Sequence, residues 1–200
     1  MTHRFSSIVR IGLVCAVAGV GLRAERPRLG VQALSSWPTG SMKSQFTDGT
    51  GYGLGAFAAW EVDAGRQWRL AYDGVTHPSK REGITLPLPG VSGADARREF
   101  RSHALTLQYL YFPQRDSEGF YFMVGLGGMN YLKKSETTVR FTAAPAWDVT
   151  VAEETGTKLA CVAGVGYEFG QNWGVTARYA FMTVDNHTLG AVQAGLSYRF

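Results

Sequence analysis

Cysteine is scarce in this sequence, and no apolar run is long enough to form a membrane-spanning helix. The 200 residues include two cysteines, Cys15 and Cys161. We expect the segment around Cys15 to be cleaved off, which leaves Cys161 without an intramolecular disulfide partner. Lipidation of Cys15 is the alternative, but Val14 stands where a small residue is expected. The apolar run from Ile11 to Leu22 covers 12 positions, whereas a transmembrane helix needs about 20.

This short run has the features of an export signal. Arg4 and Arg10 supply a basic start, the apolar run follows, and Ala24 is a small residue suited to cleavage. We therefore predict a signal peptide over residues 1–24 and a single domain over residues 25–200.

The charge balance gives no indication of a nucleic-acid partner. The whole chain has a net charge of +4. Residues 1–24 contain three arginines and no acidic residue, so the mature chain has a net charge of +1. A surface so close to neutral provides no basis for binding nucleic acid.

Sustained helical periodicity and motifs with a chemical function are also missing from the mature chain. Cysteines and histidines do not occur at the spacings of metal ligands, and no phosphate-binding glycine loop or nucleophile elbow is present. The glycines of Gly51-Tyr-Gly-Leu-Gly55 alternate as they do in a strand. We therefore expect no cofactor, no metal site and no catalytic residue.

What the chain does contain is a repeated unit of about ten alternating residues ended by a turn, which is typical of a membrane β-barrel. Connections of three to six residues alternate with longer ones, and the longest are predicted over 38–50, 78–99 and 133–157. Barrels of the outer membrane have short turns on the periplasmic side and longer loops outside. The eight predicted strands are Arg28–Trp37, Gly51–Val62, Gln67–His77, Phe100–Phe112, Gly119–Leu132, Lys158–Phe169, Trp173–Val184 and Ala191–Phe200.

Within each predicted strand, one set of alternate positions is apolar and the other is small or polar. The apolar set contains 14 aromatic rings and no charged residue. The interior of a soluble eight-stranded barrel, such as a lipocalin, is too small for that many rings. We therefore predict that the apolar set faces lipid and that the polar set lines the interior. The charged members of the polar set are Glu61, Arg69, Asp73, Glu168, Arg178 and Arg199.

The aromatic residues also occur where the boundaries of a membrane would lie. Interfacial aromatic residues anchor a barrel at the two faces of the bilayer, and those of the apolar set concentrate beside the short turns and the chain end. The members of this group are Trp60, Trp68, Tyr111, Phe120, Phe169, Trp173 and Phe200.

The last strand carries the most specific pattern, because it ends in Gly195-Leu-Ser-Tyr-Arg-Phe200. This resembles the signal read by the barrel-assembly machinery of bacteria, with Leu196, Tyr198 and Phe200 as its residues. From residue 28 onward, the sequence resembles the eight-stranded outer-membrane protein β-barrel family, which includes the transmembrane domain of outer membrane protein A, outer membrane protein X and the opacity-type surface antigens. The resemblance implies an all-β, eight-stranded antiparallel up-and-down transmembrane β-barrel in the bacterial outer membrane. It also implies roles such as adhesion and envelope integrity.

Charges inside so narrow a barrel need partners, because an unpaired buried charge is costly. Glu61 and Arg69 flank the first short turn in matching phase, so we expect them to meet across the hairpin. We favour a structural polar plug over a gate for a narrow channel, because eight strands leave no wide lumen.

A lipid A-modifying enzyme is a further alternative. His77-Pro78-Ser79, with Glu82 nearby, resembles the His-x-Ser of outer-membrane deacylases. The proline interrupts the strand geometry, and His103 and His187 are scattered, so we expect all three histidines to occupy ordinary surface positions rather than an active site.

Basic residues gather near the predicted outer rim, where they could bind lipopolysaccharide phosphates or simply be solvated. Our hypothesis is a monomeric surface barrel with a structural or interactive role. We expect it to contact outer-membrane lipid and lipopolysaccharide, and to bind a host or neighbouring surface through its long loops. The candidate lipopolysaccharide contacts are Arg97, Arg98, Arg101, Lys133 and Lys134.

Overall fold

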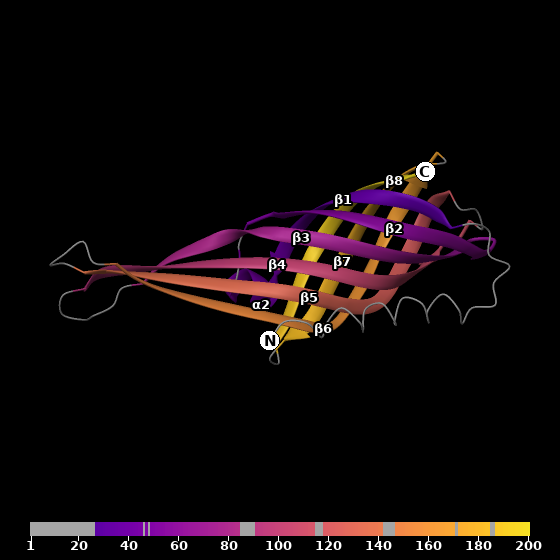
Figure 1. The fold of residues 1–200 in the computed structure, drawn as a ribbon. Helices are drawn as coiled ribbons and strands as arrows, with labels where there is room; N and C mark the ends of the chain where they lie inside the picture. The colour runs from indigo at the N-terminus through magenta and orange to yellow at the C-terminus, as the bar shows by residue number, and fades with distance from the viewer. Residues whose placement is uncertain are drawn as a thin grey trace.

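The computed structural model contains eight antiparallel strands that close into a barrel (Figure 1). It describes residues 27–45, 47, 49–84, 91–114, 118–141, 147–170, 172–184 and 187–200. The predicted signal peptide lies outside the described residues. The strands are β1 Arg28–Thr39, β2 Gly51–Asp63, β3 Arg66–Ile84, β4 Val91–Tyr111, β5 Gly119–Phe141, β6 Trp147–Phe169, β7 Trp173–Val184 and β8 His187–Arg199.

Each strand pairs with its neighbours in the sequence, and β1 pairs with β8 to complete the ring. The closing register runs from Gly30 opposite Arg199 to Thr39 opposite Gly190. The structure therefore confirms the predicted eight-stranded up-and-down barrel.

Three short connections lie at one end of the barrel, which we call the turn end; the opposite end is the outer end. Gly65, Gly119 and Gly170 occupy or adjoin these connections with φ angles of 86°, 97° and 60°. Such left-handed conformations favour glycine because it has no Cβ. The predicted contrast in connection length is wrong for most of the chain: the outer connections cover 40–50, 85–90, 142–146 and 185–186, and only the first is longer than the connection over 112–118 at the turn end.

The two sides of the barrel wall differ as the alternation predicted. Leu54 is 74% exposed and Leu159 is 69% exposed on the outer side, whereas Gln32 and Gln108 are buried on the inner side. An exterior so rich in exposed apolar side chains requires a hydrocarbon environment.

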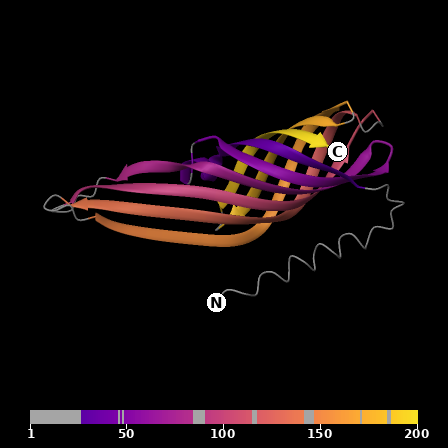
Figure 2. The same cartoon turned by 45° about the horizontal axis from the view of Figure 1, so that its top comes forward.

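Four strands extend far beyond the rest of the barrel (Figures 1 and 2). We name this extension the protruding sheet: residues 77–84 of β3, 91–101 of β4, 132–141 of β5 and 147–159 of β6. The predicted loops over 78–99 and 133–157 are therefore wrong over most of their length, since these residues continue the ladders between β3 and β4 and between β5 and β6.

The protruding sheet escaped prediction because apolar residues such as Ala94 and Val151 are interspersed with polar ones on both faces, so no continuous apolar alternation marks its strands. Pairing holds it together instead: Lys133 lies directly opposite Glu154, and Lys134 opposite Glu153. Cross-strand pairs of opposite charge stabilise a sheet. At Pro78, which cannot donate a ladder hydrogen bond, the register shifts and the strand continues.

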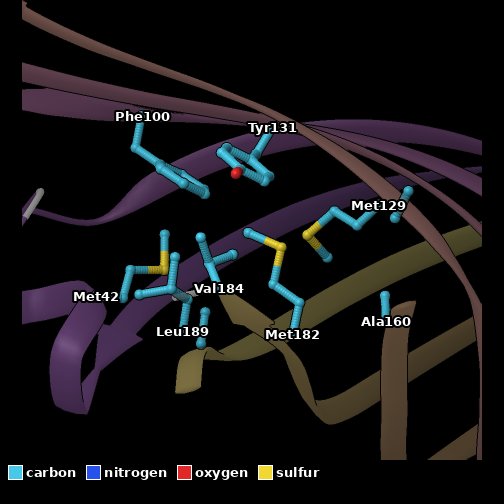
Figure 3. Packing of buried hydrophobic residues seen from close by; sticks show 10 residues of the cluster. Met42, Phe100, Met129, Tyr131, Ala160, Met182, Val184 and Leu189 are labelled. Carbon is cyan, nitrogen blue, oxygen red and sulfur yellow. The ribbon is translucent and has the colours of Figure 1, made fainter. Parts of the chain in front are cut away.

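The outer mouth of the barrel is filled by an apolar cap (Figure 3). Helix α2, Gly40–Gln45, follows β1, and its Met42 side chain is buried against side chains from the barrel wall. Within the described ranges, no helix is long and apolar enough to cross a membrane. The apolar cap consists of Met42, Phe100, Ala104, Met129, Tyr131, Ala160, Met182, Val184, Leu189 and Ala191.

Candidate functional site: the barrel interior and the protruding sheet

Glu168 joins two arginines in the barrel interior. One carboxylate oxygen lies 2.9 Å from Nη2 of Arg69, and the other lies 3.3 Å from Nη2 of Arg199. The Arg69 and Glu168 side chains are each 1% exposed. The Arg69 guanidinium also stacks over the Phe57 ring at 4.4 Å, a cation–π contact that suits a desolvated arginine.

A second ionic network lies beside the first. Asp73 binds Nη2 of Arg178 at 2.7 Å and accepts a hydrogen bond from the Gln32 amide. Nε of Arg178 donates to the Gln193 side-chain oxygen at 2.8 Å. These side chains come from β1, β3, β7 and β8, so the network ties distant parts of the ring together.

The structure places five of the six predicted interior charges inside the barrel, but it corrects Glu61. Gln67, not Arg69, lies opposite Glu61, and Arg69 lies opposite Ala59. Glu61 and Arg69 are therefore offset by two residues along the ladder and do not face each other, contrary to the prediction. Glu61 is partly exposed and lies 3.8 Å from Arg28 instead.

The interior has little space for a solute. The cavity between the ionic networks and the apolar cap, lined by Ser36, His77 and Met42 among others, has a volume of about 20 Å³. An arrangement of paired charges below an apolar cap can hold the wall together and obstruct the lumen, and it favours the plug over the channel.

The structure corrects the position of His77 and separates the three residues that resembled a deacylase motif. His77 is 2% exposed inside the barrel, and its Nε2 atom lies 3.1 Å from the Ser36 hydroxyl. The Ser79 hydroxyl accepts a hydrogen bond from Arg97, and Glu82 pairs with Lys80 at 2.6 Å. Because His77 contacts neither Ser79 nor Glu82, these residues form no catalytic triad.

The other two histidines are exposed, as predicted. His103 points outward and lies 2.9 Å from the Tyr72 hydroxyl through Nδ1, and His187 begins β8. Among the described residues, no group of three or more His, Cys, Asp or Glu side chains is placed to hold a metal ion.

The protruding sheet has two edges that differ in accessibility. Residues 147–159 of β6 pair with β5 alone, because β7 pairs only from Ala160 onward. Residues 77–84 of β3 pair with β4 alone, but the Thr47 hydroxyl donates to the Pro78 carbonyl and Lys80 donates to the Ser44 carbonyl. The β3 edge is therefore partly covered, whereas the described structure leaves the β6 edge open.

The predicted lipopolysaccharide contacts lie on this sheet, and each already has a partner within it. Their contact with lipopolysaccharide stays a prediction. The pairs are Arg97 with Ser79 at 3.1 Å, Arg98 with Glu82 at 3.6 Å, Arg101 with Glu99 at 2.6 Å, Lys133 with Glu154 at 3.2 Å and Lys134 with Glu153 at 3.9 Å.

These contacts stabilise two carboxylates in their charged form. The hydrogen bond from Lys80, together with its positive charge, lowers the pKa of Glu82 below its ordinary value. A hydrogen bond from Tyr131 and then one from Lys133 lower the pKa of Glu154.

The predicted assembly signal forms the end of the closing strand. Leu196 and Phe200 are exposed on the outer side, and Tyr198 packs edge to face on Trp173, with the ring centroids 4.9 Å apart. An exposed apolar strand end of this kind suits recognition by the assembly machinery, which stays a prediction.

A closed eight-stranded barrel with an apolar exterior and a charged interior defines a membrane β-barrel protein. Comparison with known protein families identifies the kind of membrane β-barrel: residues 7–200 match the model for the outer membrane protein beta-barrel domain. The chain belongs to this family, and its location is the bacterial outer membrane.

Solved structures share the fold at low sequence identity. Ail, the attachment invasion locus protein of Yersinia pestis, in complex with the heparin analogue sucrose octasulfate, is 15% identical with a TM-score of 0.54; the alignment covers 88% of this chain and 98% of Ail. The N-terminal barrel of Pseudomonas aeruginosa OprF is 12% identical with a TM-score of 0.52, over 89% and 100% of the two chains. No curated protein sequence matches the chain.

Proposed function

We propose that the protein is a surface-interaction barrel, which anchors the protruding sheet in the outer membrane and presents the β6 edge to an extended segment of a partner protein. The observation that carries this proposal is the open edge of β6 over residues 147–159, which pair with β5 on one side and with no described strand on the other. An unpaired strand offers a row of backbone donors and acceptors that an added strand can satisfy.

The side chains along this edge suit strand addition. Val149 and Val151 are about half exposed, and Thr150, Thr155 and Thr157 add further β-branched residues. β-Branched side chains favour an extended backbone. By contrast, the β3 edge combines a proline, a register shift and Lys80 with Arg81, all of which discourage pairing.

A channel and an enzyme are less well supported. The interior is obstructed by the ionic networks and the apolar cap, and the deacylase-like residues do not meet. Ail carries a name that refers to attachment and its structure holds a heparin analogue. In this chain, most basic residues of the protruding sheet, including Arg98, Lys133 and Lys134, are paired with nearby acids, which favours a protein partner over a polyanion. A monomeric barrel is sufficient for this role.

The test uses bacteria that express the protein and cultured epithelial cells as the probe surface. Val151→Lys places a charge on the open edge, and we expect adhesion to fall severalfold, because an edge lysine must be desolvated when a strand pairs beside it. Gly83→Lys is the matched control: it adds the same charge to the covered edge, at a site where a side chain meets no neighbouring atom.

Surface amounts of both variants are equalised by surface labelling before adhesion is compared. Equal adhesion by the parent and by both variants would show that the β6 edge is not the binding element.

A further inference from the structure

A polar pair faces outward from the lipid-facing wall of the barrel. The Tyr72 hydroxyl lies 2.9 Å from Nδ1 of His103, and the two rings stack with centroids 6.0 Å apart. The other ring nitrogen of His103, Nε2, has no hydrogen-bond partner within the described part of the chain. A polar group that faces lipid is costly unless it finds a partner, so it indicates a site.

His103 lies at the upper end of a groove on the outer wall. The groove has a volume of about 1020 Å³ and crosses β1, β2, β3, β7 and β8 before it reaches His103 on β4. The groove forms where Ala33, Gly74 and Ala194 have small side chains, and the larger Tyr52 side chain stands beside them.

The groove runs across the strands along one row of residues, in which each residue lies directly opposite the next on the neighbouring strand. Because the strands are tilted, a row of this kind climbs obliquely from the turn end toward the outer end. The row starts two residues from Trp173, which lies at the turn end. Its members, in ascending order, are Val175, Leu196, Ala33, Leu54, Gly74 and His103.

The height of His103 fits the outer boundary of the hydrocarbon. His103 lies eight residues from Tyr111, the last residue of β4 at the turn end. Strands rise about 3.3 Å per residue and tilt by about 40°, which places His103 roughly 20 Å above that end, in an apolar band about 25 Å tall. Asn130 and Thr157, which continue the row on β5 and β6, are polar, as expected near the boundary.

An apolar groove that descends from a polar pair at the outer boundary has the shape of a lipid in the outer leaflet. We propose that the groove binds an acyl chain of lipopolysaccharide, and that Nε2 of His103 donates a hydrogen bond to the carbonyl or hydroxyl oxygen at the head of that chain. This role requires the His103 tautomer with its ring proton on Nε2, in which the Tyr72 hydroxyl donates to Nδ1.

Lipopolysaccharide suits the groove because the polar pair lies at the outer end, where the acyl chains of that leaflet begin. Arg101 lies above His103 but is already engaged by Glu99 at 2.6 Å, so the proposal depends on the carbonyl or hydroxyl and not on a phosphate. It does not depend on the function proposed for the β6 edge.

Native mass spectrometry of the purified, detergent-solubilised full chain tests the proposal, with purified lipid A as the probe. We expect a one-to-one adduct. Its affinity should fall at least tenfold in Ala33→Leu, which fills the groove, and severalfold in His103→Phe, which keeps the ring against Tyr72 but removes the donor.

Ala163→Leu is the matched control, because Ala163 faces outward on β6 beyond the groove; it should bind like the parent. Heat-modifiable gel mobility confirms that each variant is folded. Phosphatidylethanolamine, offered at the same concentration, should bind more weakly. An adduct that survives both groove substitutions, or equal binding of phosphatidylethanolamine, would overturn the proposal.

Discussion

Glu168 is the acidic residue on which two buried arginines depend. It contacts Arg69 and Arg199 with its two carboxylate oxygens, and Arg199 lies one residue from the end of the chain. Phe200, the next residue, donates its backbone N–H to the Leu29 carbonyl. The ionic network therefore helps fix the strand that closes the ring.

Neutralising Glu168 should destabilise the barrel strongly. In Glu168→Gln, two buried guanidinium groups lose their anionic partner, which typically costs about 3–5 kcal/mol. Urea-induced unfolding of the protein in lipid vesicles measures the loss. The control is Glu61→Gln, for which we expect a change below about 1 kcal/mol, because that carboxylate is partly exposed and 3.8 Å from its partner. Similar losses in the two variants would contradict this account.

Glu154 should make the protruding sheet sensitive to acid. Its pKa is lowered in the folded state, so the stabilisation is present above the ordinary glutamate pKa and is lost as the pH falls through the lower, folded value. We expect backbone amides of residues 147–159 to exchange faster as the pH falls below the ordinary glutamate pKa, after correction for intrinsic rates, with the barrel strands protected. Hydrogen exchange with mass spectrometry measures this, and Glu154→Gln should reduce the pH dependence, leaving the part that Glu82 contributes.

At the scale of elements, the barrel and the protruding sheet have different sources of stability. The ring is closed by pairs that end at Thr76 on β3 and at Ala160 on β6. Within the described residues, the protruding sheet pairs with no further strand, and it is held by its own ladders, by contacts of Thr47 and Ser44 with its β3 edge, and by surface ion pairs, which contribute little individually. The closed ring of strands should therefore fold without the protruding sheet.

Shortening the protruding sheet should leave the barrel folded. Deletion of residues 81–97 and 134–153 joins Lys80 to Arg98 and Lys133 to Glu154, which are pairs that face each other across the two hairpins. We expect the temperature of the heat-induced mobility shift to change by no more than a few degrees. Failure of the shortened chain to insert into lipid vesicles would show that the sheet is required for folding.

The elements differ in how far sequence could predict them. Inside the membrane, one face of each strand must be apolar, so alternation marked the strands and placed Arg69, Asp73, Glu168, Arg178 and Arg199 inside. Above the membrane, water contacts both faces, and that constraint disappears. Pairing there depends on partners such as Lys133 and Glu154, which are distant in sequence and follow no local pattern.

Contacts that depend on the pairing register between strands could not be predicted from the sequence either. Glu61 and Arg69 share a phase, but only the ladder shows that they are offset. His77 belongs to the inner phase, yet Pro78 beside it indicated the end of a strand. The groove beside His103 depends on small residues of β1, β3 and β8, which come together only in the closed ring.

At the scale of the whole molecule, two different obstructions lie in series along the barrel axis. The Glu168 network lies toward the turn end, the Asp73 network lies further along the axis, and the apolar cap closes the outer mouth, with Met42 supplied by α2. A solute would have to displace both.

Planar-bilayer recordings should consequently show little or no conductance. Met42→Gly loosens only the apolar cap, so we expect it to remain non-conducting as well. A large, stable pore in the parent protein would contradict the plugged interior.

The protruding sheet has a thermodynamic consequence for recognition. A flexible loop loses backbone entropy when a partner immobilises it, at roughly 1–2 kcal/mol per residue. Residues 147–159 are already extended and hydrogen-bonded to β5 along one side. Residues 147–159 therefore lose little further backbone entropy when a partner strand pairs with β6. Only the partner segment becomes ordered on association.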